Sequence, residues 1–302
     1  MNLHESKQDF KDIIDAAGMI TGIVPSIIEK DYYVSLFLKE LIKSNPNIIF
    51  KGGTSLSKCY GVIDRFSEDI DLNVMTDAKR ISVGTRKELS HLIQRTIAVL
   101  GMELHNPGKI YSGRDYNRYE IAYDSLYPDE HLKSYLLIET ATWIKSYPIK
   151  VLKVDSIIGK YLCDVKRLDI VNRFCLQPFT MRVQSLDRTF LDKIFALVDY
   201  YLQKDFSGRS RHLYDLFKLQ EHVNLDAKLK KLYNDVLLER RPHKKCDSAQ
   251  ENVDLVKSLQ EIYDHDIYKS DYKDKTLYLL HEECSYDQAV EVLPVIIAWL
   301  KK

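Results

Sequence analysis

Apolar side chains recur at helical intervals near the start of the chain, which predicts two helices, at residues 6–17 and 25–42. A short apolar run at residues 48–50 then ends at Gly52 and Gly53, as a buried strand does where it enters a tight turn. Residues 69–74 alternate polar and apolar side chains with a period of two. This alternation predicts a strand whose two faces meet different surroundings.

The rest of the chain passes from strand patterns to helical ones. A helix is predicted at residues 85–100, followed by strands at 118–123 and 135–142. Beyond residue 155 helical spacing dominates, and we expect helices at 156–165, 189–202, 211–222, 227–238, 253–263 and 285–300. The last of these opens with a capping-box pattern from Ser285 to Gln288, and Pro294 should kink it.

These elements together predict an α+β fold of two lobes. Residues 1–154 are expected to form a lobe around a small mixed sheet, and residues 155–302 a helical lobe. A chain of 302 residues is long enough for two ordinary domains, each with its own core.

Charge and composition exclude several classes of protein. Lys and Arg number 44, as do Asp and Glu, so no whole-molecule field attracts nucleic acid or a membrane. Any polyanion must therefore bind to a local patch. The five cysteines follow no zinc-binding or disulfide spacing, and we expect reduced thiols. The first residues lack the apolar core of a signal peptide, and no uncharged apolar run suits a membrane span, which favours the cytoplasm.

The candidate chemistry lies between residues 50 and 75. Gly52 and Gly53 let the backbone approach a ligand, and Thr54 and Ser55 follow at a helix start, which suits a phosphate. Asp69 and Asp71 project two carboxylates from one strand face, and such hard-oxygen pairs hold Mg²⁺. Glycine pairs and Asp-x-Asp pairs are each common by chance. Their order and their place on adjacent strand patterns are typical of the polymerase-beta-like nucleotidyltransferase fold.

Six segments spread along almost the whole chain form a recognisable set: GGTSL at 52–56, RFSEDIDL at 65–72, IEKDYYV at 28–34, LDKIFAL at 191–197, RHLYDL at 211–216 and RRPHKKCDSA at 240–249. In these segments the sequence resembles the AbiEii/AbiGii toxin family, a group of bacterial nucleotidyltransferases. The resemblance implies the toxin of a type IV toxin-antitoxin or abortive-infection system, with a cognate antitoxin as partner. Some relatives modify tRNA acceptor ends.

Nucleotidyl transfer of this kind uses metal ions, Mg²⁺ or Mn²⁺, held by carboxylates. Asp69 and Asp71 would supply two of them. The best third is Glu139, the only acid in the predicted strand at 135–142, although a solvent-facing acid is an equal interpretation. Asp124 and Glu120 are reserve candidates.

The helical lobe offers a second group of candidate residues. Lys193 lies among apolar neighbours and needs an anion nearby, and the resemblance makes it a nucleotide-binding lysine. The alternative is a surface lysine on an amphipathic helix. Asp215 is either a general base for the acceptor hydroxyl or orients Lys193 by a salt bridge. Arg211 would contact phosphate, whereas His212 is better interpreted as a structural, hydrogen-bonding histidine.

Several residues near the glycine pair have two interpretations each. Thr54 or Ser55 caps the short helix, and Ser55 could also bind the triphosphate through its hydroxyl and amide. Lys58, one turn later, is a candidate for nucleotide binding. Arg65 pairs with Glu68 or with a backbone carbonyl to lock the loop. Lys30 and Asp31 match the family pattern, or form only a salt bridge between the lobes.

An RNA acceptor requires a basic surface, and one run of side chains offers it unless it is simply a solvated face. Its members are Lys228, Lys230, Lys231, Arg240, Arg241, His243, Lys244 and Lys245. The sequence thus predicts an enzyme that moves a nucleoside monophosphate from an NTP to RNA, with the tRNA acceptor end as one target. The alternatives are a two-metal phosphodiester hydrolase and a non-catalytic nucleotide-binding module.

Overall fold

The computed structural model describes residues 1–76, 78, 80–130 and 132–302. The chain forms two compact units, each built from separate segments. The first unit comprises residues 1–59, 68–145 and 149–183, and the second comprises 60–67, 146–148 and 184–302. The sequence-based boundary between residues 154 and 155 falls inside the first unit. It does so because residues 155–183 add two helices and a strand to that unit.

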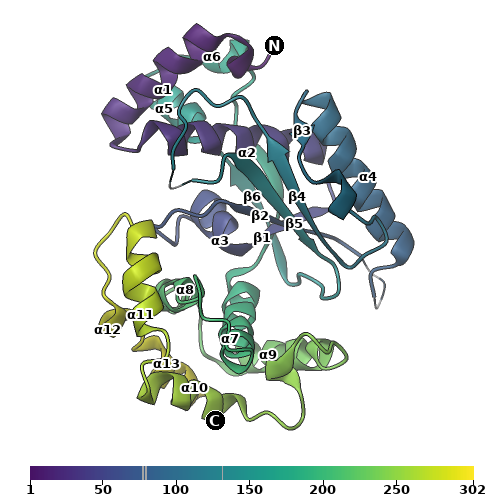
Figure 1. Cartoon of the computed structure of the whole chain (residues 1–302), viewed down its shortest axis with the longest axis vertical. Helices are drawn as coiled ribbons and strands as arrows, with labels where there is room; N and C mark the ends of the chain where they lie inside the picture. The colour runs from purple at the N-terminus through teal and green to yellow at the C-terminus, as the bar shows by residue number, and fades with distance from the viewer. Residues whose placement is uncertain (77, 79, 131) are drawn as a thin grey trace. The chain divides into compact units, whose positions relative to one another are not determined.

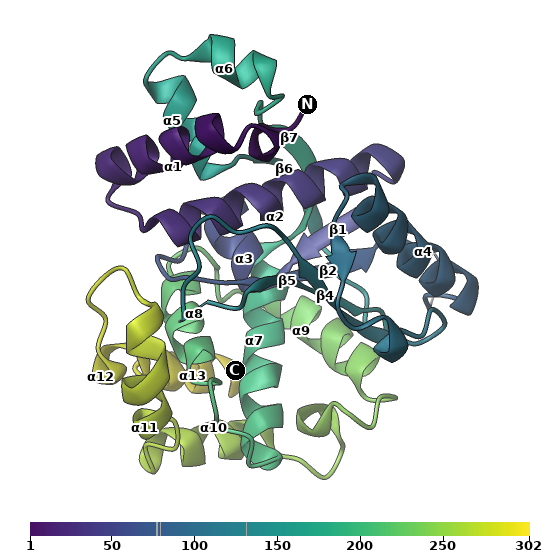
Figure 2. The same cartoon turned by 45° about the horizontal axis from the view of Figure 1, so that its top comes forward.

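The first unit is built on a mixed sheet, which Figures 1 and 2 show from two sides. Among the described residues the sheet has seven strands, in the order β3-β4-β5-β2-β1-β7-β6. The strands are β1 (Ile48–Lys51), β2 (Asp69–Val74), β3 (Glu103–Leu104), β4 (Tyr116–Ala122), β5 (Tyr135–Ala141), β6 (Ile149–Val154) and β7 (Phe179–Gln184). At its centre β2 pairs antiparallel with β1 and parallel with β5. The four strands expected from the sequence are confirmed.

The sheet is larger than the sequence pattern predicts, because β3, β6 and β7 were not expected. β3 is only two residues long, too short to show a pattern. β6 occupies the edge and exposes three of its six side chains, so it lacks a clean apolar alternation. β7 lies among helices in the sequence and joins β1 by a parallel pairing, which no local pattern reveals.

Helices surround the sheet of the first unit. They are α1 (Lys7–Thr21), α2 (Pro25–Ser44), α3 (Gly52–Ser55), α4 (Val83–Val99), α5 (Ile157–Asp164) and α6 (Leu168–Arg173), with short turns η1 (Leu3–Glu5), η2 (Leu56–Tyr60) and η3 (Pro107–Lys109). α2 lies beside α1 and contacts β5 (Figures 1 and 2). The core between helices and sheet is fully buried at Phe37, Phe50, Ile70, Leu72 and Ile138.

The second unit is helical. Its helices are α7 (Leu186–Leu202), α8 (Arg211–Leu219), α9 (Ala227–Arg240), α10 (Leu255–Asp264), α11 (Lys269–Asp271), α12 (Tyr286–Ala289) and α13 (Val292–Leu300), with turns η4 (Asp247–Ala249), η5 (Tyr272–Thr276) and η6 (Leu277–Leu279). α7 and α8 lie side by side, as Figure 2 shows. No helix in the described part of the chain is long and apolar enough to span a membrane.

The end of the chain differs from the single kinked helix that the sequence predicts. The capping box of Ser285 and Gln288 is confirmed, but it begins only the four-residue α12. A new helix, α13, starts at Val292, so Pro294 occupies its first turn. A proline is tolerated there because its missing N–H would have no partner inside the helix.

Candidate functional site

The acidic strand β2 places its two aspartates on one face of the sheet. Asp69 and Asp71 are two residues apart, so both side chains point to the same side, whereas Ile70 and Leu72 are fully buried on the other. The parallel pairing with β5 sets Asp71 directly opposite Glu139. The two aspartates and Glu139 therefore share one face of the central strands.

Two basic side chains flank these acids in the same row. Lys51 of β1 lies opposite Asp71, and Arg118 of β4 lies opposite Glu139. Across four neighbouring strands the row thus runs Lys51, Asp71, Glu139, Arg118, with two acids between two bases. Sequence reasoning missed both bases, because only the pairing of distant strands places them beside the acids.

Two of the acids are held by partners in the first unit. The ammonium of Lys133 donates to Asp69 at 2.7 Å, and the hydroxyl of Tyr116 donates to Glu139 at 2.7 Å. Burial and the charge of Glu139 raise the pKa of Tyr116, so its hydroxyl stays protonated and remains a donor. Neither partner was predicted from the sequence, since each lies on a segment remote from the motif.

The chemical type of these side chains suits a hard divalent cation. Asp69, Asp71 and Glu139 offer carboxylate oxygens, the ligands that Mg²⁺ prefers. Within the described residues, however, no three side chains of His, Cys, Asp or Glu are gathered into a metal-binding group. Of the reserve acids, Asp124 is exposed and pairs with Lys7, and Glu120 pairs with Arg118 at 3.2 Å. Glu139 is thus the acid in register with Asp71.

The glycine turn abuts the acidic strand. Gly52 has a φ of +77°, and a Cβ placed on it would lie 1.9 Å from the Oδ2 atom of Asp71. The hydroxyl of Thr54 donates to the carbonyl of Asp69, and that of Ser55 donates to the carbonyl of Gly52. Only a glycine leaves room for the carboxylate at this turn.

The expected helix cap at Thr54 or Ser55 is wrong. Helical backbone already begins at Gly52, so both hydroxyls lie inside the turn and satisfy backbone carbonyls. Gly53 follows Gly52 in the same turn.

The basic residues of the first unit that the sequence singled out have acidic partners in that unit. Lys58 pairs with Asp31, whose other carboxylate oxygen accepts the N–H of Ile157 at 2.7 Å. Lys30 is buried and pairs with Glu68 at 2.5 Å. These ion pairs lie within one unit, so the interpretation of Lys30 and Asp31 as a bridge between lobes is wrong.

In the second unit, three charged side chains form a buried cluster. Asp215 of α8 accepts two hydrogen bonds from Arg65, at 2.7 Å each, and one from Lys193 of α7, at 2.5 Å. The side chains of Arg65, Lys193 and Asp215 are 2%, 8% and 0% exposed. Arg65 also donates to the carbonyl of Phe66. The carboxylate partner of Arg65 is therefore Asp215. The sequence did not predict this ion pair.

The protonation of Asp215 bears on its two proposed roles. Burial alone would raise the pKa of Asp215, but the charges of Arg65 and Lys193 outweigh it and hold the pKa well below its usual range. A carboxylate that holds its proton so weakly, and whose oxygens already accept three hydrogen bonds, is a poor general base near neutral pH. The geometry favours Asp215 as the group that orients Lys193.

The segment that carries Arg65 is hydrogen-bonded to the helical unit to which it belongs. The N–H of Asp64 donates to the Tyr214 hydroxyl at 2.9 Å, and the N–H of Phe66 donates to the carbonyl of Leu279 at 2.8 Å. The N–H of His281 in turn donates to the backbone carbonyl of Asp64 at 3.0 Å. This short antiparallel pairing fixes the position of the Arg65 guanidinium.

Arg211 and His212 open helix α8. The imidazole of His212 stacks against Tyr200, with ring centroids 5.6 Å apart. Neither ring nitrogen has a hydrogen-bond partner in the part of the chain that the structure describes. The interpretation of His212 as a hydrogen-bonding histidine is therefore wrong, and its role is packing. Burial lowers the pKa of His212 well below its usual value, so the ring is neutral at physiological pH.

Part of the basic run is used inside the helical unit. Arg240 is buried and pairs with Asp192 at 3.0 Å and with Asp199 at 3.5 Å. Lys230 donates to the carbonyl of Leu300 at 2.6 Å. The run is thus a mixture of structural cations and exposed ones, because α9 packs one of its faces against its neighbours.

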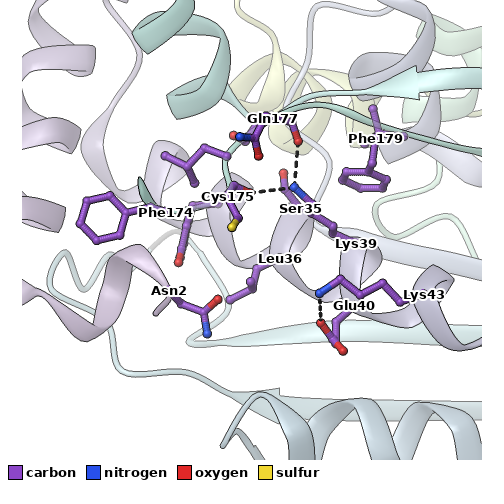
Figure 3. Close-up of a pocket in the computed structure, with 14 residues that line it drawn as sticks. Asn2, Ser35, Leu36, Lys39, Glu40, Lys43, Phe174, Cys175, Gln177 and Phe179 are labelled. Carbon is purple, nitrogen blue, oxygen red and sulfur yellow. Dashed lines mark hydrogen bonds and ion pairs between the residues drawn. The ribbon is translucent and has the colours of Figure 1, made fainter. Parts of the chain in front are cut away.

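The first unit also contains a separate pocket, with a cavity of about 70 Å³, between helix α2 and the segment before β7 (Figure 3). Lys39 donates there to the carbonyls of Cys175 and Gln177, and Lys43 pairs with Glu40. None of the site residues predicted from the sequence lines this pocket.

A family model for the nucleotidyl transferase AbiEii toxin of type IV toxin-antitoxin systems matches residues 36–291. The chain belongs to this family. The match covers β1, the glycine turn, the acidic strand and helices α7 and α8, so it includes both groups of candidate residues. A comparison with curated proteins gives no match.

Membership of the AbiEii family confirms the resemblance found in the sequence and the α+β nucleotidyltransferase fold. It makes the chain a nucleotidyltransferase of a toxin family whose systems pair a toxin with an antitoxin.

Replacing Gly52 with alanine should lower the free energy of unfolding of this AbiEii chain by more than the backbone strain at its positive φ alone would. The backbone strain costs about 1–2 kcal/mol, and the clash with Asp71 adds about 1–3 kcal/mol. Gly22→Ala is the matched control, because Gly22 has a φ of +72° but nothing within 4 Å of the added Cβ. Urea denaturation measures both, and equal losses of unfolding free energy would contradict the close approach of Gly52 to Asp71.

Asp215→Asn should lower the free energy of unfolding at pH 7 by about 3–5 kcal/mol, because it leaves two buried cations uncompensated. Because the pKa of Asp215 is depressed in the folded state, its stabilisation is full above about pH 4 and is lost as the pH falls further. The difference between wild type and variant in urea denaturation should therefore shrink from pH 7 to pH 3.

Asp205→Asn is the control for this experiment, since it breaks a partly exposed pair with Arg209 in the same unit. A loss of at most about 1 kcal/mol is expected there. An Asp215 variant no less stable than the Asp205 variant would show that the buried cluster is not a structural requirement.

Proposed function

We propose that the chain transfers a nucleoside monophosphate from an NTP to a hydroxyl group of RNA, with the tRNA acceptor end as the first candidate. The observation that carries this proposal is the contact between the glycine turn and the acidic strand. Gly52 leaves its backbone against the carboxylate of Asp71, and Glu139 lies in register beside it. The backbone proposed to bind phosphate therefore lies next to the carboxylates proposed to bind a divalent cation.

The first unit supplies the ligands and the cradle in this proposal. Asp69 and Asp71 hold the cation, Mg²⁺ or Mn²⁺, with Glu139 as the third carboxylate. The cation, when bound, neutralises charge on the reacting phosphates. The backbone of Gly52 and Gly53 faces the triphosphate, with Thr54 and Ser55 keeping the turn in shape by their hydrogen bonds.

The second unit offers further candidate residues, and these are cationic. Lys193 and Arg211 are proposed to contact the triphosphate. Arg65, Lys193 and Asp215 together carry a net charge of +1, so the cluster suits an anionic ligand even after Asp215 is satisfied. Lys58 of the first unit, whose ammonium pairs with Asp31, would have to leave that partner to contact a nucleotide.

The reaction that fits these groups is an in-line displacement. The acceptor oxygen bonds to the α-phosphorus of the NTP, the bond to the pyrophosphate oxygen breaks, and the hydroxyl proton is released to water. Asp215 is not the base in this scheme, because its pKa is too low. The exposed members of the basic run, such as Lys228 and Lys231, would contact the RNA backbone.

Incubation of the purified chain with total RNA, Mg²⁺ and each labelled NTP tests the proposal. The wild type should add label and length to an RNA, and Asp71→Asn should reduce labelling by on the order of a hundredfold or more, because it removes charge from the cation holder. Asp124→Asn is the matched control, because Asp124 is an exposed acid of the same unit and should tolerate the change.

Three results would contradict the proposal. Equal labelling by wild type and Asp71→Asn would remove the acidic strand from the reaction. Shortening of RNA with Mg²⁺ alone would indicate a phosphodiester hydrolase. Tight NTP binding without turnover on any RNA would indicate a nucleotide-binding module.

A further inference from the structure

One ammonium group already lies on the acidic face of the first unit. The Nζ atom of Lys133 is 2.7 Å from the Oδ1 atom of Asp69, and the two side chains are 33% and 18% exposed. Lys133 lies on the segment between β4 and β5, more than sixty residues along the chain from Asp69. No sequence motif includes it.

The backbone of Lys133 is held on both sides, so its position is not a chance surface contact. Its N–H donates to Glu68 at 2.9 Å, and its carbonyl accepts from the ammonium of Lys30 at 2.7 Å. Lys30 also binds Glu68 and is only 2% exposed in its side chain. The Lys30 and Glu68 pair therefore fixes the residue from which the Lys133 side chain reaches Asp69.

The charges explain why a lysine is placed there. Asp69, Asp71 and Glu139 share one face, and neighbouring carboxylates repel each other unless a cation lies between or beside them. The contact of Lys133 neutralises one of these charges. A lysine ammonium and a divalent cation are alternative partners for the same carboxylate oxygen.

We propose that Lys133 is a resident counter-ion of Asp69, which a divalent cation must displace before it binds the acidic face. This inference rests on the proposed function, because that function assigns the cation to Asp69 and Asp71. In the structure, Asp69 accepts a hydrogen bond from Lys133, and Glu139 accepts one from Tyr116.

The same arrangement couples the cation to the nucleotide. Free divalent cations meet competition from Lys133 and bind weakly. A triphosphate offers the displaced ammonium new anionic oxygens, so the cation binds more tightly when the nucleotide is present. By reciprocity the cation strengthens nucleotide binding by the same factor. Lys133 thereby favours loading of the two together.

The test measures Mn²⁺ affinity by titration calorimetry, first without nucleotide. Lys133→Met removes the competing charge and should raise the affinity by about tenfold, equivalent to about 1.4 kcal/mol. Lys133→Arg keeps the charge and should bind Mn²⁺ as the wild type does. Lys7→Met is the matched control, because it removes a lysine from another Asp contact of 2.8 Å in the same unit.

The second arm adds a non-hydrolysable NTP analogue. The gain in Mn²⁺ affinity on adding the analogue should be several-fold greater for the wild type than for Lys133→Met. Urea denaturation of each variant checks that the fold is intact, and a midpoint shared with the wild type is expected.

The outcomes separate this inference from the proposed function. If the wild type binds Mn²⁺ and Asp71→Asn abolishes that binding, the result supports the assignment of the cation to Asp69 and Asp71. Unchanged or weaker Mn²⁺ affinity in Lys133→Met then overturns the role of Lys133 alone. If neither the wild type nor Lys133→Met binds Mn²⁺, with or without the analogue, both proposals fail.

Discussion

The pairing of β2 with β1 on one side and β5 on the other is the constraint on which the candidate site of the first unit depends. A strand alternates its side chains between two faces, so the buried Ile70 and Leu72 oblige Asp69 and Asp71 to occupy the opposite one. A register slip of one residue would bury carboxylates and expose apolar side chains, at a large cost in free energy. The apolar core thereby fixes the chemistry of the other face.

Local sequence predicts the features of this site that depend on periodicity or on backbone conformation. The alternation at residues 69–74 predicted strand β2, and the glycine pair predicted the turn beside it. The structure confirms both. Glu139 could be proposed because it is the single acid in an apolar strand. The family match at residues 36–291 includes all of these segments.

What the sequence could not show is which distant groups meet. Lys133 reaches Asp69 only because Lys30 and Glu68 fix its backbone, and no spacing along the chain encodes that contact. The partner of Arg65 is likewise Asp215, 150 residues away, whereas the nearby Glu68 has other partners. Such pairs follow from tertiary packing, which overrides the local preference for a neighbour in sequence.

The eight residues from Tyr60 to Ser67 interrupt the first unit and belong to the second. The helical unit is therefore not a contiguous piece of the gene. Residues 184–302 expressed alone would lack Arg65, leave Lys193 as the only cation of the cluster against Asp215, and lose the backbone partner of Leu279. Exchange of this unit between related toxins by recombination would have to include residues 60–67, which lie between segments of the first unit. The two units would therefore be inherited together.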